Sequence, residues 1–490
     1  MSDASTGLIT DLYQLTMAQG YWLHGRADEQ AVFHLGFRKH PFGGGYAIAC
    51  GLEQAVELIE QFRYDAGQRD YLASLTGNDG RPLFDPRFLD WLGQLKPTVD
   101  VDAMPEGTAC FAHQPLLRVR GPLAQAQLLE TALLTIVNFQ TLIATKAARI
   151  CHAAVGEPVI EFGLRRAQGL DGGLSASRAA YIGGCVATSN VAAGARFGIP
   201  VKGTHAHSWV MAFPGEAEAF SAYAQAMPNN CVFLVDTYDT LRGVDRAIAE
   251  AVALRERGHE LAGIRLDSGD LIALSKAARE KLDAAGFPNA AIVASNDLDE
   301  WAITELKQAG AAISVWGVGT RLATAHDQCA LGGVYKLSAL RADPTAPWRR
   351  MVKLSDTPIK TSIPGILQVR RHRRDGKPLL DVVYDEELGR PQPGAGANDI
   401  DPLRDTRVPV PADADADAND LLIPVLRAGK RVAPAESTTQ MRERALAERA
   451  SLPAEVLRLA DPDRYPVALE ARVAELKRAL IEAARSGAQS

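Results

Sequence analysis

The chain has 490 residues, 47% of them hydrophobic and 23% charged, which is ordinary for a globular protein and too long for one simple core. The net charge of −6 offers no general attraction to nucleic acid or an anionic membrane, so neither is expected as a partner. Any anionic ligand must instead be bound by a local group of basic residues. Six widely spaced cysteines, no Cys-x-x-Cys pair, no basic-then-apolar leader and no long apolar stretch predict a cytoplasmic protein without zinc knuckles, disulfide framework or membrane span.

The first 120 residues begin with a predicted helix, which Thr10 can cap and which runs to about Leu23. Tyr13 lies about 100° around that helix from Leu12 and is free to point away from the packed face. A second, longer helix is predicted over 123–149, and its apolar circumference indicates that it is buried. The helical spacing predicts that the packed face of the first helix holds Leu12, Leu15, Gln19 and Trp22.

Between residues 157 and 340 the chain repeats one pattern about eight times: a short apolar run that ends in polar or small residues. Helical stretches over 216–226, 241–257, 271–285 and 298–308 separate several of these runs. Alternating buried strands and helices are typical of a β/α barrel, whose site lies at the carboxyl ends of the strands. The predicted strands are 159–162, 185–187, 201–208, 231–235, 263–270, 291–294, 313–316 and 333–336.

After Lys336 the alternation stops and hairpin signals follow. Asp375-Gly376 separates two apolar runs, and Ala428-Gly429 separates two more, so antiparallel strands are expected to join the N-terminal segment. The predicted domains are an N-terminal α+β segment (1–125), an α/β barrel (126–340) and a C-terminal segment that returns to the first and ends in helices (341–490). The Ala-Asp repeat within 411–420 is predicted to be a solvated linker. Its Asp-x-Asp-x-Asp run resembles the start of a calcium loop, but the required glycine and glutamate are absent, so no metal site is expected there.

Two strand ends carry features that suit an anion. Arg165-Arg166 offers bidentate donors for a carboxylate or phosphate. Gly317-Val318-Gly319-Thr320 follows one strand and precedes a helix, so its backbone amides can converge on a phosphate, although a tight turn without a ligand explains the same residues. Arg178 and Arg321 are further candidates.

Carboxylates follow other strands. Arg265 and Asp267 lie on the same side of one strand, where they form either a structural ion pair or a site for a polar ligand and its magnesium ion. Several acids together with several arginines suit a pyrophosphate–Mg²⁺ complex. The other acids at strand ends are Asp236, Asp239 and Asp297.

His205 and His207 lie at one strand end and invite comparison with a metal-dependent barrel hydrolase. That chemistry needs further histidines at other strand ends, and the sequence places none there. The sequence therefore favours a single functional His207, acting as a nucleophile or as an acid and base, over a two-histidine metal site.

Five motifs in this order and spacing resemble the nicotinate phosphoribosyltransferase family, from about residue 7 to about residue 480. The resemblance implies an irregular α/β barrel of the type II phosphoribosyltransferases, an α+β domain built from both chain ends, and a homodimer with shared active sites. It also implies ATP-coupled transfer of phosphoribosyl from 5-phosphoribosyl 1-diphosphate (PRPP) to nicotinate, with Mg²⁺ and a phosphorylated histidine, as the first step of NAD synthesis from nicotinate. The motifs are TDLYQLTM from Thr10, EFGLRRAQ from Glu161, GTHAHS from Gly203, RLDSGDL from Arg265 and GVGT from Gly317.

The same resemblance implies roles for individual residues. His207 matches the phosphorylated histidine, and Thr320 matches a residue that contacts PRPP. Tyr13 matches a tyrosine that stacks on the pyridine ring from the partner subunit, and Phe162 matches the aromatic residue on the opposite face. Thr204 and Arg265 match nicotinate-contacting residues.

Physical arguments extend this set. Arg165 can serve the carboxylate of nicotinate or a phosphate, and Asp267 is a catalytic candidate near the ribose. Gly317, Gly319 and Asn296 are expected at PRPP, although Ser295-Asn296-Asp297 differs from the Gly-Asp pair that holds the ribose in nicotinamide-specific relatives. No side-chain cage for a metal is expected; Mg²⁺ would arrive on the pyrophosphate, with Asp267 or Asp270 as candidate ligands.

Alternatives remain at this point. A nicotinamide-preferring phosphoribosyltransferase differs by one or two groups around the carboxylate. A metal-dependent barrel hydrolase belongs to another class, and a non-catalytic nucleotide-binding relative is a third reading.

Overall fold

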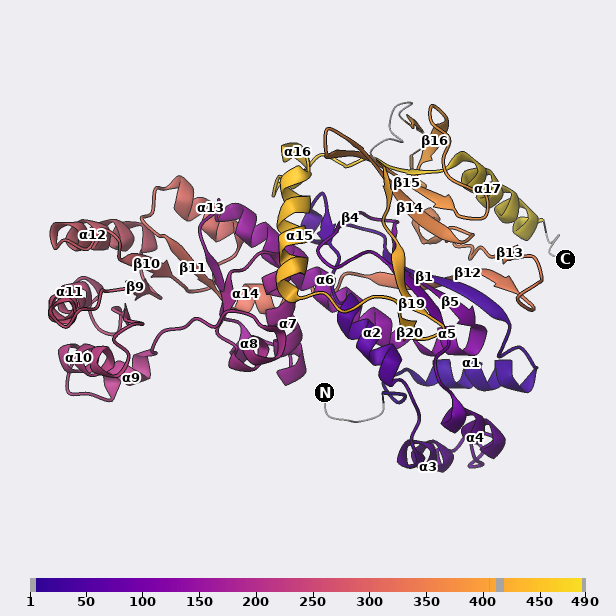
Figure 1. The fold of residues 1–490 in the computed structure, drawn as a ribbon, viewed down its shortest axis with the longest axis horizontal. Helices are drawn as coiled ribbons and strands as arrows, with labels where there is room; N and C mark the ends of the chain where they lie inside the picture. The colour runs from indigo at the N-terminus through magenta and orange to yellow at the C-terminus, as the bar shows by residue number, and fades with distance from the viewer. Residues whose placement is uncertain (1–5, 405, 411–417, 487–490) are drawn as a thin grey trace. The chain divides into compact units, whose positions relative to one another are not determined.

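The computed structural model describes residues 6–404, 406–410 and 418–486 (Figure 1). The chain forms two compact units: unit 1 holds Met1–Leu142, Ala330–Glu436 and Glu443–Ser490, and unit 2 holds Ile143–Cys329 and Ser437–Arg442. Each unit is described by itself. The borders predicted at 125/126 and 340/341 remain a prediction, and the Asp-rich part of the expected linker, 411–417, lies outside the described residues.

Unit 1 contains a seven-stranded sheet in the order β13-β12-β1-β5-β3-β19-β20, and each of its paired neighbours runs antiparallel. Strands from both ends of the chain therefore share one sheet, as the hairpin signals predict. Its strands are β1 (Gln30–Phe37), β3 (Asp100–Ala103), β5 (Pro115–Pro122), β12 (Gly333–Arg341), β13 (Arg349–Arg350), β19 (Ile423–Arg427) and β20 (Lys430–Arg431).

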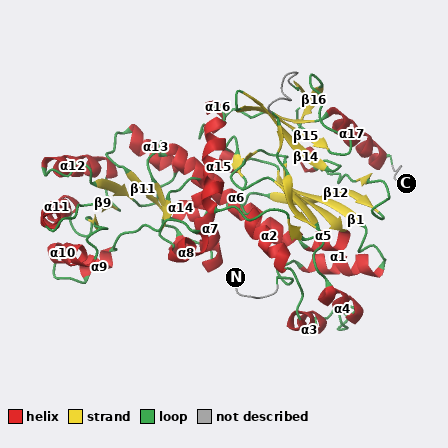
Figure 2. Cartoon of the chain, viewed as in Figure 1, coloured by secondary structure: helices red, strands yellow, loops and turns green. Residues whose placement is uncertain are grey.

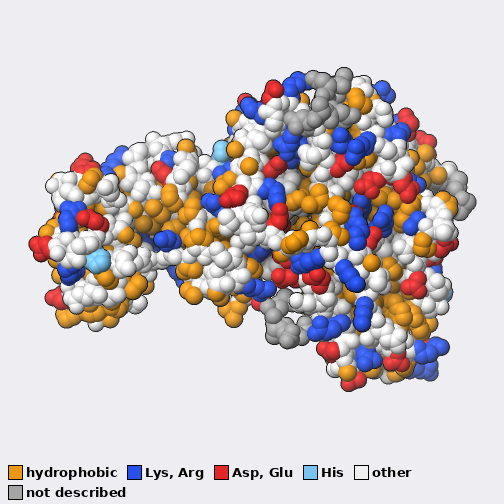
Figure 3. Space-filling model, viewed as in Figure 1, with side chains coloured by type: hydrophobic (Ala, Val, Ile, Leu, Met, Phe, Trp, Pro, Cys, Tyr) orange, Lys and Arg blue, Asp and Glu red, His pale blue; other side chains and the backbone are white. Residues whose placement is uncertain are grey.

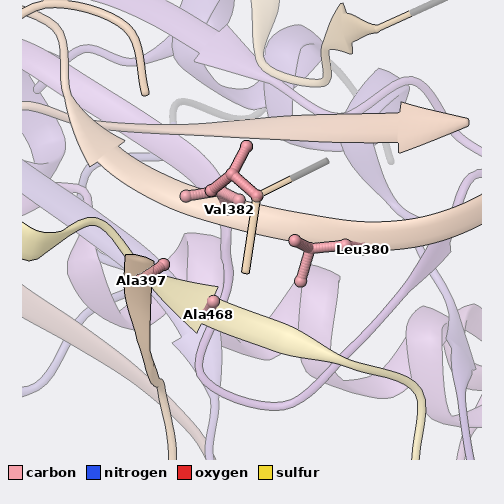
Figure 4. Packing of buried hydrophobic residues seen from close by; sticks show 5 residues of the cluster. Leu380, Val382, Ala397 and Ala468 are labelled. Atoms are coloured by element: carbon pink, nitrogen blue, oxygen red, sulfur yellow. The ribbon is translucent and has the colours of Figure 1, made fainter. Parts of the chain in front are cut away.

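A second sheet of unit 1 has the order β17-β16-β21-β15-β14-β18. Leu380 and Val382 of β15 pack with Ala397 of β16 and Ala468 of β21 in a buried apolar cluster (Figure 4). The strands are β14 (Leu367–Arg374), β15 (Lys377–Asp385), β16 (Gly396–Asp399), β17 (Arg407–Pro409), β18 (Asn419–Asp420) and β21 (Val467–Leu469), and β2 (Ala47–Ile48) and β4 (Ala109–Cys110) form a separate pair.

Both predicted hairpins are confirmed. Asp375 (φ 52°) and Gly376 (φ 73°) connect β14 to β15, and Ala428 (φ 48°) and Gly429 (φ 75°) connect β19 to β20. Two consecutive residues with positive φ are the conformation that a two-residue hairpin turn requires.

The prediction that 333–336 forms a barrel strand is wrong. These residues open β12, which pairs antiparallel with β1 in unit 1. Tyr335 explains the placement, because its ring stacks on Phe33 with 4.8 Å between ring centroids and its hydroxyl donates to the Ala126 carbonyl. An apolar run alone does not distinguish a parallel from an antiparallel partner.

The first helix, α1 (Leu12–Leu23), begins after Asp11 rather than after a Thr10 cap. Its buried residues are Gln14, Leu15 and Ala18, whereas Leu12 is 53% exposed, so the prediction that Leu12 packs inward is wrong. Gln14 is buried because Gln127 donates to its carbonyl oxygen and its amide donates to Glu130 (3.1 Å). The apolar spacing of the sequence could not predict this burial, because the polar partners of Gln14 lie more than 100 residues away in the chain.

The predicted helix 123–149 is divided into α5 (Leu123–Leu128) and α6 (Glu130–Ala153), and α6 supplies residues to both units. Among the described residues, no helix is both long and apolar enough to cross a membrane. The remaining helices with residues in unit 1 are α2 (Leu52–Gln61), α3 (Ala66–Ser74), α4 (Pro86–Gln94), α15 (Thr438–Ser451), α16 (Ala454–Leu457) and α17 (Ala471–Arg485).

Unit 2 is built on a six-stranded parallel sheet in the order β7-β6-β11-β10-β9-β8. Helices such as α11 (Thr240–Glu256) and α12 (Leu271–Ala284) pack along its strands, as the alternation of colours in Figure 2 shows. The strands are β6 (Val159–Glu161), β7 (Ala187–Thr188), β8 (Val232–Leu234), β9 (Gly263–Leu266), β10 (Ala291–Ala294) and β11 (Val315–Val318).

Residues 201–208 were expected to form a strand, and this prediction is wrong. Val201 makes only a single parallel bridge to Thr188 of the edge strand β7. Further along, the Leu234 amide of the other edge strand, β8, donates to His205 Nε2 at 3.2 Å. The segment therefore contacts both edges of the sheet through a bridge and a side chain, and helix α9 (His207–Met211) follows at once.

Candidate functional site

The carboxyl ends of the parallel strands of unit 2 meet at one edge of the sheet, and most of the predicted site residues lie there. Phe162 follows β6, Arg265 is in β9 and Asp267 follows it. Thr204 and His207 come from the irregular segment that contacts both edge strands. The parallel register thus gathers side chains from distant stretches of sequence.

The Arg265 guanidinium is held by three side chains. Its Nη1 donates to Thr204 Oγ1 (3.1 Å), its Nη2 to Asp267 Oδ1 (2.7 Å) and its Nε to Ser295 Oγ (2.8 Å). Its Cζ lies 5.6 Å from the centroid of the Phe162 ring. A cation and an aromatic face are thereby fixed next to each other, which is the pairing that a flat aromatic anion requires.

His207 is oriented at both of its nitrogens. Nδ1 lies 3.1 Å from Thr237 Oγ1, and Nε2 lies 3.8 Å from Asp267 Oδ2 and 4.0 Å from Asp236 Oδ1. The imidazole is 39% exposed and forms the first residue of α9, so it can meet a ligand from solvent. The ring nitrogen Nε2 therefore faces two carboxylates, one on each of two neighbouring strand ends.

Asp236 is the most buried acid of the group, with 1% of its side chain exposed. Its Oδ2 accepts from the Asp267 amide (2.8 Å) and from Ser268 Oγ (2.7 Å), whereas its Oδ1 has no hydrogen-bond partner among the described residues. A buried carboxylate oxygen without a donor is costly, so this atom is suited to a ligand.

The Asp267 carboxyl is expected to be ionised at neutral pH. Burial disfavours its charged form, but the hydrogen bond from Ser295 and the charge and hydrogen bond of Arg265 outweigh that effect and hold the pKa of Asp267 below its ordinary value. The site therefore presents an anion beside His207.

The turn after β11 is shaped around Phe162. A Cβ on Gly317 would lie 2.6 Å from Phe162 Cε2, and one on Gly319 would lie 3.3 Å from the Phe162 carbonyl oxygen. The Phe162 amide donates to Val318 O (2.8 Å), and Thr320 then opens the short helix α14 (Thr320–Ala323). The glycines of this motif allow the aromatic ring and the turn to pack together.

Some predicted residues are not joined to this cluster. Arg165 lies in the exposed turn Leu164–Arg166 and makes no hydrogen bond or ion pair with the described residues. Asn296 is exposed and left-handed (φ 95°), and Asp270 Oδ1 caps helix α12 by accepting from Ile272 and Ala273 amides. Tyr13 lies on α1 of unit 1 and is 48% exposed. Their predicted roles remain predictions.

The pair His205 and His207 does not form a metal site of the hydrolase kind. His205 is buried, its Nε2 accepts from the Leu234 amide, and its ring packs edge-on against Tyr223. Burial lowers the pKa of His205 to about 4, so the ring is a neutral structural group. Within the described ranges, no group of three His, Cys, Asp or Glu side chains is placed to hold a metal ion.

Sequence reasoning did not assign roles to Ser295 and Thr237, which belong to this cluster, or to Glu161 of the neighbouring strand β6. Ser295 and Thr237 follow strands β10 and β8 and could have been found by the strand-end rule. Glu161 lies inside an apolar run, and its buried carboxylate accepts from Ser177 Oγ (2.8 Å) and Thr188 Oγ1 (2.6 Å). A charged residue within an apolar run, as Glu161 is, could have indicated a buried polar site in the sequence.

Comparisons with known proteins identify the family of this chain. The model of the nicotinate phosphoribosyltransferase (NAPRTase) family matches residues 158–386, with its N-terminal domain model at 8–138 and its C-terminal domain model at 368–477. A Bacillus subtilis (strain 168) nicotinate phosphoribosyltransferase is 48% identical over 79% of this chain and 78% of its own length. The chain belongs to the nicotinate phosphoribosyltransferase family.

Two human comparisons extend along almost the whole chain. A human nicotinate phosphoribosyltransferase is 37% identical over 97% of this chain and 97% of its own length. The crystal structure of human nicotinic acid phosphoribosyltransferase, 35% identical, covers 96% of this chain and 100% of that chain with a TM-score of 0.83. The resemblance, the α/β fold class and the enzyme class expected from the sequence are confirmed, as is the assignment to NAD biosynthesis.

Proposed function

We propose that this nicotinate phosphoribosyltransferase couples ATP hydrolysis to the transfer of phosphoribosyl from PRPP to nicotinate, giving nicotinate mononucleotide, pyrophosphate, ADP and phosphate. One observation carries the proposal: Thr204, Arg265 and Asp267 form a continuous hydrogen-bonded group, and Asp267 lies beside His207. A binding group for a carboxylate and a histidine suited to phosphorylation are thereby adjacent.

The acceptor subsite follows from Phe162 and Arg265. The Phe162 ring provides a face for the pyridine ring, and the Arg265 guanidinium provides donors for the nicotinate carboxylate. Thr204 lies beside the carboxylate in this arrangement, where its hydroxyl accepts from Arg265 Nη1 and donates to the His205 carbonyl. The ring nitrogen then attacks C1 of PRPP and the bond from C1 to the pyrophosphate oxygen breaks. Such a step depends on alignment and on stabilisation of the leaving group more than on a strong general base.

The leaving group is assigned to the turn that contains Gly317, Gly319 and Thr320, whose backbone amides can converge on a phosphate. Arg165 is exposed on the turn after β6 and has no ion-pair partner among the residues that the structure describes. Asn296 is assigned to the sugar. These assignments rest on the family motifs and on the common edge of the parallel strands.

The carboxylates fit a magnesium ion that arrives with the pyrophosphate. Asp236 Oδ1 is buried and receives no hydrogen bond from the described part of the chain, and Asp267 presents a second oxygen to the same His207 nitrogen, whereas Asp270 is already engaged as a helix cap. Asp267 is therefore the better of the two candidate ligands. Bound Mg²⁺ would neutralise charge on the pyrophosphate.

Phosphorylation of His207 would add about two negative charges beside Asp236 and Asp267. A change of that size, next to two carboxylates, can alter the affinity of the site for anions, and this is the proposed link between ATP hydrolysis and synthesis.

A homodimer with shared sites is proposed for the assembly, with Tyr13 stacking on the pyridine ring in the partner's site. The outer face of α1 supports it: Leu12, Tyr13 and Met17 are 53%, 48% and 38% exposed, and Ile9 just before the helix is 45% exposed. Apolar side chains that gather on one surface mark an interface. A cytoplasmic location is proposed with it, in keeping with six widely spaced cysteines that include no Cys-x-x-Cys pair.

The test is an assay of purified protein with PRPP and Mg²⁺, comparing nicotinate with nicotinamide, with and without ATP, while mononucleotide and ADP are measured. The expected result is preferential use of nicotinate with stoichiometric ADP formation. Preference for nicotinamide would instead show the amide-specific activity.

The role of His207 is tested by His207→Ala. This variant is expected to retain slow, ATP-independent synthesis and to lose all stimulation by ATP, because the phosphoryl acceptor is missing. Retention of full ATP stimulation would refute the assignment. His259→Ala serves as the control, since that histidine lies outside the site, between α11 and β9.

A further inference from the structure

Ser295, the residue that follows β10, joins the two charged groups of the site. Its hydroxyl oxygen accepts from Arg265 Nε at 2.8 Å, and the hydroxyl proton is donated to Asp267 Oδ1. The side chain is buried, with 4% of the residue exposed, so water does not compete readily for either bond. The Ser295 amide donates to the Leu266 carbonyl (2.9 Å), which ties β10 to β9 at this point.

These bonds determine the orientation of both partners. With Nη1 held by Thr204 and Nη2 by Asp267, the Nε contact is the third point that fixes the plane of the Arg265 guanidinium. Asp267 Oδ1 is satisfied by Arg265 and Ser295, which leaves Oδ2 directed at His207, 3.8 Å away. The Ser295 hydroxyl therefore helps to fix the orientation of both the Arg265 guanidinium and the Asp267 carboxylate.

The backbone that follows Ser295 has a conformation that is energetically unfavourable for residues other than glycine. The two residues that follow, Asn296 and Asp297, are both left-handed, with φ of 95° and 42°. Non-glycine residues in this region are uncommon and occur at sites where the surrounding structure imposes the conformation. The turn leaves the strand sharply just after the hydroxyl that contacts Arg265 and Asp267.

We propose that Ser295 is a positioning residue for the transfer reaction, which fixes the Arg265 guanidinium in the plane that recognises a carboxylate and so contributes to the selection of nicotinate over its amide. The inference rests on the proposed function and deepens it. Ser295 need not touch either substrate. It acts through Arg265, and the orientation of Asp267 toward His207 depends on the same hydroxyl.

The experiment compares Ser295→Ala with the wild-type protein, using nicotinate, nicotinamide and PRPP as probes. Loss of the hydroxyl removes a hydrogen bond to each of two charged groups, so kcat/KM for nicotinate is expected to fall about 10- to 100-fold. The fall should be carried mainly by KM for nicotinate, with KM for PRPP nearly unchanged and with a smaller ratio of nicotinate to nicotinamide use. A merely structural role would not change that ratio.

Two further variants test whether the hydroxyl itself, rather than the loss of the serine, causes the change in selectivity. Ser295→Thr retains the hydroxyl and is expected to restore most of the selectivity, whereas Ser295→Cys keeps the volume with a weaker donor and should be intermediate. Should Ser295→Ala fail to fold, the order wild type, Thr, Cys still tests the inference. Equal selectivity in all folded variants would overturn it.

The matched control is Ser314→Ala. The Ser314 hydroxyl accepts from the Ile292 amide of β10 at 3.0 Å, so it bonds to the same strand but outside the site. Its loss should leave the kinetics unchanged, and an equal effect of both alanine variants would overturn the proposal. Failure of the proposed function is distinguishable, because the wild-type protein itself would then not use nicotinate.

Discussion

Gly317 has no room for a side chain. A Cβ at this position would lie 2.6 Å from Phe162 Cε2 and 2.8 Å from Cδ2, so Gly317→Ala forces the ring to move. Overpacking of this kind costs about 1–3 kcal/mol. We expect kcat/KM for nicotinate to fall about tenfold or more, because the ring that meets the pyridine is displaced. Steady-state kinetics check this, with Gly172→Ala as the control, since nothing lies within 4 Å of a Cβ there.

Arg371 and Asp381 form a fully buried ion pair in unit 1, with both side chains 0% exposed and 2.7 Å between Nη2 and Oδ2. Tyr465 Oη donates to Asp381 at 3.0 Å, and Glu448 accepts from Arg371 at 2.6 Å. Asp381→Ala removes the carboxylate that accepts from Nε and Nη2 of this buried guanidinium and leaves Glu448 as its remaining acidic partner, so the free energy of unfolding is expected to fall by about 3 kcal/mol.

Denaturant unfolding measures this change. The control is Glu260→Ala, which removes an exposed partner of Arg255 and should leave the transition almost where it was. Equal shifts in the two variants would contradict the argument that burial makes the difference.

The basic run from Arg370 to Arg374 is not a free cationic patch, because carboxylates from elsewhere in the sequence pair with three of its arginines. Arg370 pairs with Asp420, Arg371 with Asp381 and Arg373 with Glu448, each from a different part of unit 1. Figure 3 shows acidic and basic side chains interspersed over the drawn face, in keeping with the modest net charge. The sequence shows the arginines, but the acids that neutralise them are brought in by the fold.

At the site, the strand-end rule predicted His207, Arg265 and Asp267 because the type of residue and its position after an apolar run were both visible. It could not predict that Ser295 bonds to Arg265 and Asp267, since that contact depends on the register of β10 against β9. Likewise, Asp236 was visible as an acid at a strand end, but its bond to the Asp267 amide was not.

At the scale of elements, Asp299 connects two helices of unit 2. Its Oδ1 caps α13 (Glu300–Gln308) by accepting from the Trp301 and Ala302 amides, and its Oδ2 accepts from Arg321 Nη1 of α14 at 2.5 Å. Asp299→Ala removes both interactions and is expected to lower the free energy of unfolding by about 1–3 kcal/mol.

The contribution of Asp299 should depend on pH. Burial opposes its ionisation, but the cap amides and the Arg321 guanidinium outweigh burial and lower the pKa of Asp299 in the folded state. A carboxyl with a lowered folded pKa stabilises fully above its unfolded pKa and loses that effect as pH falls through the folded value. The difference between wild type and Asp299→Ala should therefore be largest near neutral pH and shrink in acid. A constant difference down to about pH 2 would contradict this.

Helices and buried strands with strong periodicity were predicted well, and the misses have physical causes. The helix α10 (Glu216–Ala226) has the predicted bounds, because its apolar spacing and flanking residues agree. Residues 201–208 read as a strand but meet the sheet edges through a single bridge and the His205 ring. Residues 333–336 form a strand, yet the choice of β1 as partner rests on the Tyr335–Phe33 contact, which links distant parts of the sequence.

At the scale of the whole molecule, the exposed apolar face of α1 requires an explanation. The helix is anchored inward by Gln14, Leu15 and Ala18, and its opposite side leaves Leu12 and Tyr13 about half exposed. If Tyr13 were part of the hydrophobic core, its side chain would be buried, but it is 48% exposed. Its exposure instead fits the proposed homodimer, in which the tyrosine completes the site of the partner subunit.

Complementation tests whether the sites are shared. Tyr13→Ala removes the proposed stacking ring, and Arg265→Ala removes the cation that is held by Thr204 and Asp267, so each homodimer should have low activity. In a mixed dimer of the two variants, one site would receive Tyr13 from one chain and Arg265 from the other and would be intact. Random mixing gives such dimers about half of the time, so about one quarter of the wild-type activity should return. Co-expression with two different affinity tags, followed by tandem purification of the mixed dimer, raises the expected value to about one half. If each site were completed by its own chain, every site of the mixed dimer would lack one of the two side chains, and the activity would stay at the level of the separate variants.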